Sequence, residues 1–366
     1  MGYETDLRIG VIPPALLSSA LISRDWSERI KPHINELRTI ENEFVLLAGT
    51  GNTRLGNTVA QLLGQPLHYS VQRFSGGYQD EPEVVGRVPP GSSHKQAIII
   101  QSTGAPVNTS LMELCVMCDA AKRTGAEDIM VVVPYLAYSR QDRKDQSGAS
   151  ITARLVADIL QTAGANRIVT CDLHAEQETG FYNIPVDHLY ASLVLIPHLK
   201  ELIERHNLRF KGGAPDGGAD KKVRAYARRI DGGDIVTFQK ERDVIKGGKS
   251  HIVGCQGDIE GYDLMLIDDQ LAGGATLDES AEYALAHGAK SVRGIITHGL
   301  FLGRDKKSPT QILNESPLKE IIATDTIDIP DEIRNHPKVT VVSIAPLLAE
   351  VIYRNLVGKP LADLVT

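Results

Sequence analysis

Short apolar runs alternate along this chain with longer segments whose apolar residues recur at helical spacing. Alternation of this kind is typical of parallel sheets covered by helices on both faces, so the pattern predicts an α/β fold. The apolar runs predict strands at residues 44–47, 97–101, 129–133, 167–171, 235–238, 264–267, 291–297 and 340–342. The other segments predict helices at residues 57–63, 110–124, 150–163, 221–229, 278–287 and 346–356.

The length of 366 residues is sufficient for two such domains, each with its own core. We expect two doubly wound domains with parallel sheets flanked by helices, at residues 41–187 and 188–345, with residues 181–191 crossing between them. The C-terminal segment 346–366 carries a helix that we expect to pack back on the first domain. Residues 1–40 form an extension in which one helical face is shared by Trp26, Ile30, Ile34 and Leu37.

Composition and charge exclude several kinds of partner. Hydrophobic residues make up 42% of the chain and charged residues 23%, as in a soluble globular protein. The formal net charge of −7 gives no general attraction to nucleic acids or acidic membranes, and no apolar run is long enough to span a bilayer. We therefore expect no nucleic-acid partner, no membrane partner and, without a recognisable signal peptide, a cytoplasmic location.

The four cysteines fit a reducing compartment. Cys115 and Cys118 form a C-x-x-C pair, which is compatible with metal or redox chemistry. The segment around them instead has the pattern of an amphipathic helix, and no second cysteine pair lies nearby to complete a zinc site. Both observations favour packing of these cysteines in the core. Cys171 and Cys255 are isolated, and we interpret them as structural.

The segment YDLMLIDDQLAGGATL, residues 262–277, has the pattern of a sugar-phosphate site. An apolar strand ends in the acids Asp268 and Asp269, which suit the paired hydroxyls of a ribose. A small-residue loop then precedes a predicted helix, so that backbone N–H groups and the helix N-terminus can surround a phosphate. The alternative is a plain connection between strand and helix. The loop consists of Ala272, Gly273, Gly274, Ala275 and Thr276.

A second cluster, PYLAYSRQDRK, follows the predicted strand at 129–133. Arg140, Arg143 and Lys144 surround Gln141 and Asp142 at a strand end, where α/β proteins form ligand sites. Arginine forks suit polyphosphate oxygens and a glutamine suits a base, although a solvated charged loop has the same composition.

Two short motifs suggest metal or phosphate contacts. In TCDLHAEQ, His174 lies between Asp172 and Glu176, a set that suits a hard cation or a nucleotide phosphate, although a lone histidine is more often structural. In PDGG, Asp216 precedes two glycines, and a simple turn is the alternative to a metal or ribose role.

A cationic segment, FQKER, is followed by glycines and lysines at residues 246–249. Such a segment suits a loop that folds over a substrate, where Lys240 and Arg242 neutralise charge in a phosphoryl-transfer transition state. A solvated hairpin is the alternative.

Taken in this order, the motifs resemble those of the ribose-phosphate diphosphokinase (phosphoribosyl pyrophosphate synthetase) family, from about residue 44 to residue 364. The resemblance rests on IIIQSTGAPVNTSLMELCVM, VVVPYLAYSRQDRKD, ITARLVADILQTAGANRIVTCDLHAEQETGFYNIPVDHLYAS, PDGG, DIEGYDLMLIDD, ITHGLFLG and VVSIAPLLAEVIYR. It implies two similar domains of the type I phosphoribosyltransferase kind and a dimer-based homo-oligomer, possibly a hexamer. The implied reaction converts ATP and ribose 5-phosphate to AMP and phosphoribosyl pyrophosphate, with Mg²⁺ as cofactor.

The resemblance also implies roles for single residues. The catalytic residues would be Lys240, Arg242 and His174, and the metal-associated residues His174 and Asp216. The ribose 5-phosphate site would comprise Asp268, Asp269 and the loop 272–276. ATP would be bound by Phe74, Arg140, Gln141, Asp142, Lys144, Asp145 and His174. Because the ATP motifs and the sugar-phosphate loop lie in different domains, we expect the active site between them, with Asp268 and His174 within about 20 Å.

Several positions depart from the family pattern. Gly76 and Tyr78 replace two acids expected near the adenine. The sugar-phosphate loop lacks a threonine hydroxyl and has Ala275 where the backbone must approach the phosphate closely. Gly148 stands where the phosphate-activated class usually has an arginine, which suggests weak regulation by phosphate and ADP. These departures leave open a catalytically weak or silent regulatory relative that binds an active synthetase, whereas a phosphoribosyltransferase would not account for residues 134–144 and 170–177.

Overall fold

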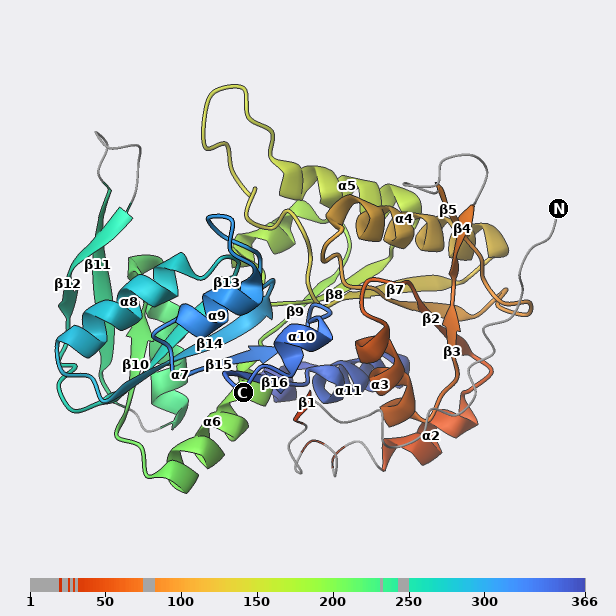
Figure 1. Ribbon diagram of the computed structural model, residues 1–366. Helices are drawn as coiled ribbons and strands as arrows, with labels where there is room; N and C mark the ends of the chain where they lie inside the picture. The colour runs from red at the N-terminus through yellow and green to blue at the C-terminus, as the bar shows by residue number, and fades with distance from the viewer. Residues whose placement is uncertain are drawn as a thin grey trace.

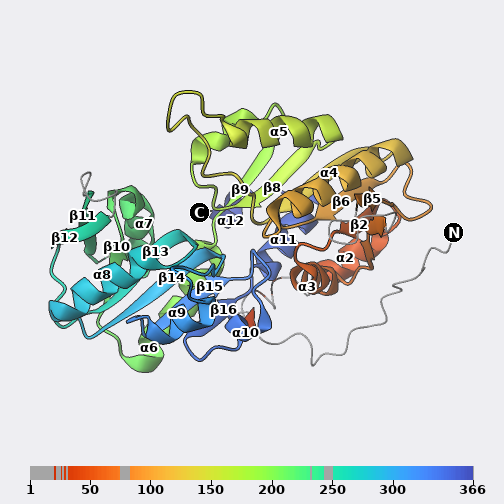
Figure 2. The same cartoon turned by 45° about the horizontal axis from the view of Figure 1, so that its top comes forward.

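The computed structural model describes residues 20–21, 26, 29, 32–74, 83–230, 233–242 and 250–365. It confirms the predicted α/β class, with two sheets flanked by helices that lie side by side (Figures 1 and 2). Every strand predicted from an apolar run is present. No helix in the described part of the chain is both long and apolar enough to cross a membrane.

The first half is built on a sheet of six parallel strands. Their order is β3 (Leu67–Tyr69), β2 (Phe44–Ala48), β6 (Gln96–Ile100), β7 (Asp128–Val133), β8 (Arg167–Cys171) and β9 (Val186–Leu189). One face packs on α4 (Val107–Thr124) and α5 (Thr152–Ala163), and the other packs on α3 (Thr53–Leu63) and α11 (Ala345–Leu356). A separate antiparallel pair, β4 (Val71–Phe74) and β5 (Glu83–Gly86), lies against α4.

The expected domain boundary at 187/188 falls inside β9. This strand pairs with β8 up to Leu189, so residues 186–189 of the segment expected to cross between the domains belong to the first sheet. The crossing itself is short, because α6 (Ser192–His206) begins three residues after Leu189. The short helix η2 (Glu176–Phe181) precedes β9.

The second half has a larger, mixed sheet. Its order is β1 (Ala20–Leu21), β16 (Val339–Val342), β15 (Glu320–Thr324), β14 (Ser291–Gly299), β13 (Asp263–Leu271), β10 (Phe210–Ala214), β11 (Ile235–Arg242) and β12 (Ser250–Gln256). Only the β11–β12 pair is antiparallel. One face packs on α6 and α7 (Asp220–Ile230), and the other on α8 (Ala275–Ala286) and α9 (Pro309–Glu315). Shorter helices are η3 (Gly217–Ala219), α10 (Asp331–Arg334) and α12 (Ala362–Val365).

The N-terminal extension contacts both halves. Strand β1 pairs with β16 of the second sheet, and the Trp26 indole donates a hydrogen bond to the carbonyl of Leu193 on α6 at 3.2 Å. Helix α2 (His33–Thr39) packs on α3, and the His33 ring contacts the Glu350 carboxylate of α11 at 2.8 Å. Trp26 and Leu37 are buried, whereas Ile30 lies outside the described residues.

Helix α11 returns from the second sheet to the first half, where it packs against α3. Both sheets therefore share one continuous hydrophobic core around α11, α6 and α7. The carboxyl ends of β7 and β8 lie near the carboxyl end of β13, and the predicted site residues Arg140, Gln141, His174 and Asp269 lie at this meeting point.

Candidate active site

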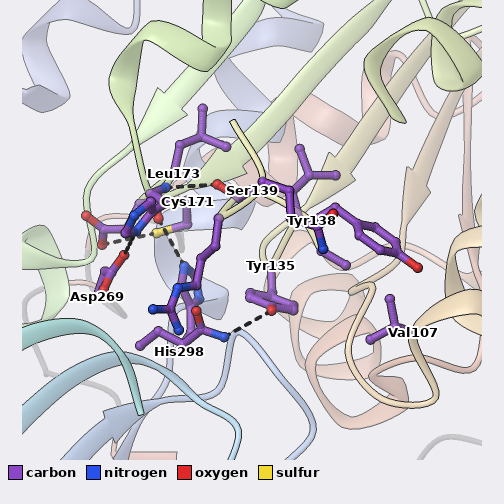
Figure 3. Close-up of a pocket in the computed structure, with 15 residues that line it drawn as sticks. Val107, Tyr135, Tyr138, Ser139, Cys171, Leu173, Asp269 and His298 are labelled. Carbon is purple, nitrogen blue, oxygen red and sulfur yellow. Dashed lines mark hydrogen bonds and ion pairs between the residues drawn. The ribbon is translucent and has the colours of Figure 1, made fainter. Parts of the chain in front are cut away.

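A pocket of about 250 Å³ lies between the two halves, at the carboxyl ends of their parallel strands. Parallel sheets commonly bind ligands at this edge. Figure 3 shows Asp269 at one end of the pocket and Tyr138 and Val107 at the other. The residues that line it are Val107, Tyr135, Leu136, Ala137, Tyr138, Ser139, Arg140, Gln141, Cys171, Asp172, Leu173, His174, Asp269, Gln270 and His298.

His174 and the acid pair meet directly across the two halves. Nδ1 of His174, just after β8, lies 2.7 Å from Oδ2 of Asp269 in β13, and the Asp269 N–H donates to Oδ1 of Asp268 at 2.8 Å. The expectation that Asp268 and His174 lie within about 20 Å is thus met by a chain of direct contacts. Of the residues predicted for ATP, Arg140, Gln141 and His174 line this pocket, and of those predicted for the sugar, Asp269 does. The loop residues Ala272, Gly273 and Gly274 line a separate pocket.

The electrostatics of this contact follow from burial and proximity. The hydrogen bond to Asp269 raises the pKa of His174 above its ordinary value. Burial raises the pKa of Asp269, yet its hydrogen bonds to His174 and Asp268 outweigh this and hold it below the ordinary value. Burial and the neighbouring Asp269 carboxylate raise the pKa of Asp268 instead. The pair therefore favours one carboxylate over two, unless a ligand brings further positive charge.

Asp172, which flanks His174 in the predicted motif, forms contacts within the protein. Its side chain is buried, and its Oδ2 accepts hydrogen bonds from the N–H of Ala191 at 2.9 Å and the hydroxyl of Thr297 at 2.8 Å. The other flanking acid, Glu176, is exposed and accepts a hydrogen bond from the Tyr190 hydroxyl at 3.2 Å.

The ATP motif is anchored at one point and otherwise open. The hydroxyl of Ser139 accepts a hydrogen bond from the His174 N–H at 2.9 Å and donates one to the buried Glu178 carboxylate at 2.7 Å. Beyond this anchor, the five predicted ATP-binding side chains within residues 140–145 form no hydrogen bond or ion pair with any residue that the structure describes. These are Arg140, Gln141, Asp142, Lys144 and Asp145. Their freedom fits a ligand supplied from outside.

The predicted sugar-phosphate loop precedes α8, although this helix begins at Ala275, so that Ala275 and Thr276 belong to its first turn. Gly274 is the N-cap residue with a φ of 76°, a left-handed conformation that glycine adopts without strain, and no side chain caps the helix. The first N–H groups of α8, from Ala275 and Thr276, therefore have no side-chain partner at this end. The stem of Arg304 lies beside Gly273, so that a Cβ at Gly273 would come within 3.3 Å of the Arg304 Cβ.

Asp216 follows β10 and lies near the acid pair. Its Oδ1 accepts hydrogen bonds from the N–H groups of Gly218 at 2.9 Å and Ala219 at 3.3 Å, so the predicted turn is present. Its charge contributes to the raised pKa of Asp268. Within the described residues, no three His, Cys, Asp or Glu side chains form a ready-made metal cluster.

Other predicted residues are placed only in part. Lys240 is half-buried in β11, opposite Ile252 of β12. Arg242 and Phe74 are the last residues of β11 and β4, and their side chains are not among those described. Gly76, Tyr78 and residues 246–249 lie outside the described residues.

Sequence reasoning missed several residues that complete the pocket. Tyr135 accepts a hydrogen bond from the Gln270 amide at 3.2 Å, and its ring lies 5.0 Å from that of His298. Nε2 of His298 lies 3.2 Å from the carbonyl oxygen of Asp172. His298 belongs to the ITHGLFLG motif, which was a signal for its importance, whereas no local pattern marks Tyr135 or Gln270.

Of the four cysteines, Cys171 lines the pocket. The four are free thiols, and Cys118 is buried in the core between α4 and the first sheet. Burial raises the pKa of Cys115 to about 11 and that of Cys118 further, so both remain protonated thiols. Packing in the core accounts for the positions of Cys115 and Cys118.

Comparison with known proteins identifies the family. The chain matches the N-terminal domain of ribose phosphate pyrophosphokinase over residues 44–164 and the phosphoribosyl synthetase-associated domain over residues 217–365. A ribose-phosphate pyrophosphokinase of Caldanaerobacter subterraneus subsp. tengcongensis is 38% identical, over 89% of this chain and 98% of that protein. One from Helicobacter hepaticus is 38% identical, over 85% of this chain and 95% of that protein.

A solved structure agrees with these matches. The crystal structure of phosphoribosylpyrophosphate synthetase from Mycobacterium smegmatis has a TM-score of 0.77 and 33% identity, and the match covers 87% of this chain and 100% of that one. The similarity therefore includes both halves and both sides of the pocket, and it confirms the resemblance indicated by the motifs. The chain belongs to the ribose-phosphate pyrophosphokinase family.

Proposed function

We propose that this chain transfers the pyrophosphoryl group of ATP to the anomeric hydroxyl of ribose 5-phosphate, giving phosphoribosyl pyrophosphate and AMP. The observation that carries the proposal is the 2.7 Å contact between His174 of the first half and Asp269 of the second. It joins the turn beside the ATP motif to the acid pair expected for the ribose, as a reaction between two bound substrates requires. Membership of the family supplies the reaction class.

On the sugar side, Asp268 and Asp269 would accept hydrogen bonds from ribose hydroxyls. The 5-phosphate would lie at the N-terminus of α8, where uncapped N–H groups and the helix dipole favour an anion. Thr276 retains one hydroxyl for this phosphate. Backbone donors can therefore replace part of what the loop lacks in side-chain donors.

On the ATP side, Arg140, Gln141, Asp142, Lys144 and Asp145 would bind the nucleotide. Arginine and lysine neutralise phosphate charge, while the amide of Gln141 suits a base edge. By resemblance, Phe74 would stack on the adenine, and in a dimer-based oligomer it would reach the neighbouring subunit's ATP.

The donor set fits Mg²⁺ supplied together with ATP. Mg²⁺ is commonly held by one or two protein groups and by substrate phosphates, so a cluster of three protein ligands is not required. When His174 is neutral, its Nδ1–H would donate to the Asp269 carboxylate and leave a lone pair on Nε2, an arrangement seen in carboxylate–histidine–metal sites. His174 and Oδ2 of Asp216 would hold the ion, which when bound neutralises charge on the phosphates.

In the reaction, the anomeric oxygen attacks the β-phosphorus of ATP. The new O–P bond forms as the bond from the β-phosphorus to the oxygen of the α-phosphate breaks, and AMP leaves with that electron pair while the hydroxyl proton passes to water. Lys240 and Arg242 of β11 would neutralise charge on the transferred group, so catalysis rests on positioning and electrostatics without a covalent intermediate.

A coupled assay tests the proposal. AMP and ADP release from ATP are measured with Mg²⁺, with and without ribose 5-phosphate. We expect AMP release that depends on ribose 5-phosphate, without matching ADP. Binding of both substrates without AMP release would instead support a silent regulatory relative.

We also propose that the protein forms a homo-oligomer and acts in the cytoplasm. A monomeric mass in solution would contradict the proposed homo-oligomer.

A further inference from the structure

An ion pair between the two halves lies beneath the pocket. Nζ of Lys222, in the first turn of α7 of the second half, lies 3.4 Å from Oδ1 of Asp172, just after β8 of the first half. The Asp172 side chain is 5% exposed and that of Lys222 is 27% exposed, so water screens the pair only weakly. The role of Lys222 is not explained by any substrate assignment above.

Asp172 connects the parts of the molecule that must stay aligned. Its other carboxylate oxygen accepts hydrogen bonds from the N–H of Ala191, in the short crossing between the halves, and from the hydroxyl of Thr297 in β14. Its φ of 39° is left-handed, which is uncommon for a residue with a side chain. Two residues later, His174 reaches Asp269. The direction of the His174 turn is therefore fixed by the contacts of Asp172.

The charge of Lys222 also acts on the acid pair. Burial lowers the pKa of Lys222, but the carboxylates of Asp172, Asp269 and Asp268 outweigh this and raise it. Lys222 likewise helps to hold the pKa of Asp269 low. Removing this charge would leave a buried Asp172 carboxylate without its cation, which is costly at such sites.

We propose that Lys222 is a positioning residue of the shared site. With Asp172, it fixes the His174 turn of the first half against the acid pair of the second, without itself contacting substrate. The inference rests on the proposed reaction, because misalignment of two bound substrates is what would slow it. A displacement of about 1 Å between reacting groups can reduce a rate about 100-fold.

Kinetics of three variants test this. Lys222→Met removes the charge and keeps the shape, whereas Lys222→Arg keeps the charge. Lys221→Met is the matched control, because Lys221 is exposed and its Nζ pairs with the exposed Glu176 carboxylate at 3.5 Å, where water screens the pair. We expect Lys222→Met to lower kcat about 10- to 100-fold, with the KM of each substrate changing less than about 3-fold. Lys222→Arg should recover most of the loss, and Lys221→Met should match the parent protein.

Parent-like turnover of Lys222→Met would overturn the inference. So would a selective rise in the KM of ribose 5-phosphate at unchanged kcat, since this would make Lys222 a substrate ligand. If Lys222→Met does not fold, Thr297→Val replaces it. This variant removes the hydroxyl of another second-half partner of Asp172, and we expect the same kind of loss in kcat, but a smaller one. Failure of the proposed function is distinguishable, because the parent protein itself would then release no AMP.

Amide exchange at residues 172–174 gives a readout without turnover: faster exchange in Lys222→Met supports the inference and unchanged exchange overturns it.

Discussion

The two sides of the pocket differ in how firmly their side chains are held. On the sugar side, Asp268 and Asp269 belong to β13, which lies between β10 and β14 in the interior of its sheet, and Asp269 already contacts His174. On the ATP side, the side chains of Arg140 and Lys144 are exposed and form no ion pair with a described residue. Lys240 lies on β11, next to the edge strand β12.

This difference matches the chemistry that each side must perform. A ribose is small and is recognised by oxygen atoms in fixed positions, so rigid acceptors reduce the entropy lost on binding. ATP carries several charges, and the long cationic side chains that neutralise them lose conformational freedom only when the phosphates arrive. The site is thus preorganised around the sugar and completed by the nucleotide.

The largest effect is expected on the open side, at Lys240. Lys240→Ala should lower kcat by about 100- to 1,000-fold with little change in the KM of ATP, because the lysine would act mainly on the transition state. Steady-state kinetics with both substrates measure this. Glu241→Gln, at the exposed neighbouring position, is the control. Equal losses in ATP affinity and turnover would make Lys240 a binding residue.

Asp268→Ala tests the preorganised side. Loss of contacts to the ribose hydroxyls should weaken ribose 5-phosphate binding by about 10- to 100-fold, since a hydrogen bond to a charged group contributes about 1.5–3 kcal/mol. ATP binding should change much less. Calorimetric titration with each substrate separates the two, with Glu282→Ala on the exposed face of α8 as the control. An unchanged sugar affinity would refute the assignment.

A smaller effect is expected from inorganic phosphate. Gly148 is exposed, has a φ of 81°, and has no atom within 4 Å of the position of a Cβ, so the position itself supplies no side-chain charge to an anion. We expect phosphate to change the rate less than about 2-fold, because a missing charge-assisted contact weakens anion binding about 10- to 100-fold. ADP should act only as a competitor of ATP. A steep activation curve without a basal rate would contradict this reading of Gly148.

The smallest effect concerns pH and the His174–Asp269 contact. The raised pKa of His174 means that its stabilising contribution is complete below its ordinary value of 6.5 and is lost as the pH rises through the raised value. The lowered pKa of Asp269 means that its contribution is present above 3.8 and is lost only in acid. The contact should therefore stabilise the protein most between these two values.

Denaturant unfolding at pH 6 and pH 9 measures this effect. His174→Gln should cost less than about 1 kcal/mol at pH 6, because the His174 side chain is 41% exposed and screened by water, and less still at pH 9. His206→Gln, at an exposed position on α6, should show no such pH dependence. A cost that grows with pH would contradict the assigned direction.

The sequence predicted the fold where patterns are local. Apolar runs such as those of β7, β8 and β13 mark strands by themselves. Strand β10 was missed because it reads FKGGA, which resembles a loop. A Cβ on Gly212 would lie 2.9 Å from Val223 of α7, and one on Gly213 would lie 2.7 Å from Leu266 of β13, so close packing requires both glycines.

The site was predictable in its motifs and not in its connections. Strand-end positions marked His174 and Asp268, because parallel strands bring their carboxyl ends to one edge, and the PDGG motif marked Asp216. The burial of Asp172 and its pairing with Lys222 depend on tertiary contacts across 50 residues or more, which leave no periodic signal. Functional residues on the surface are thus easier to read from sequence than the buried residues that align them.

Amide hydrogen exchange tests the central claim most directly, namely that the sugar side is preorganised and the ATP side is completed by its ligand. Exchange is measured without ligand, with ribose 5-phosphate, and with a non-hydrolysable ATP analogue and Mg²⁺. We expect residues 171–174 and 263–269 to be protected in the free protein and to change little, whereas residues 138–146 and 235–242 gain protection only with the nucleotide. Equal protection of both regions before ligand, or a gain at residues 263–269 as large as that at residues 138–146, would contradict the claim.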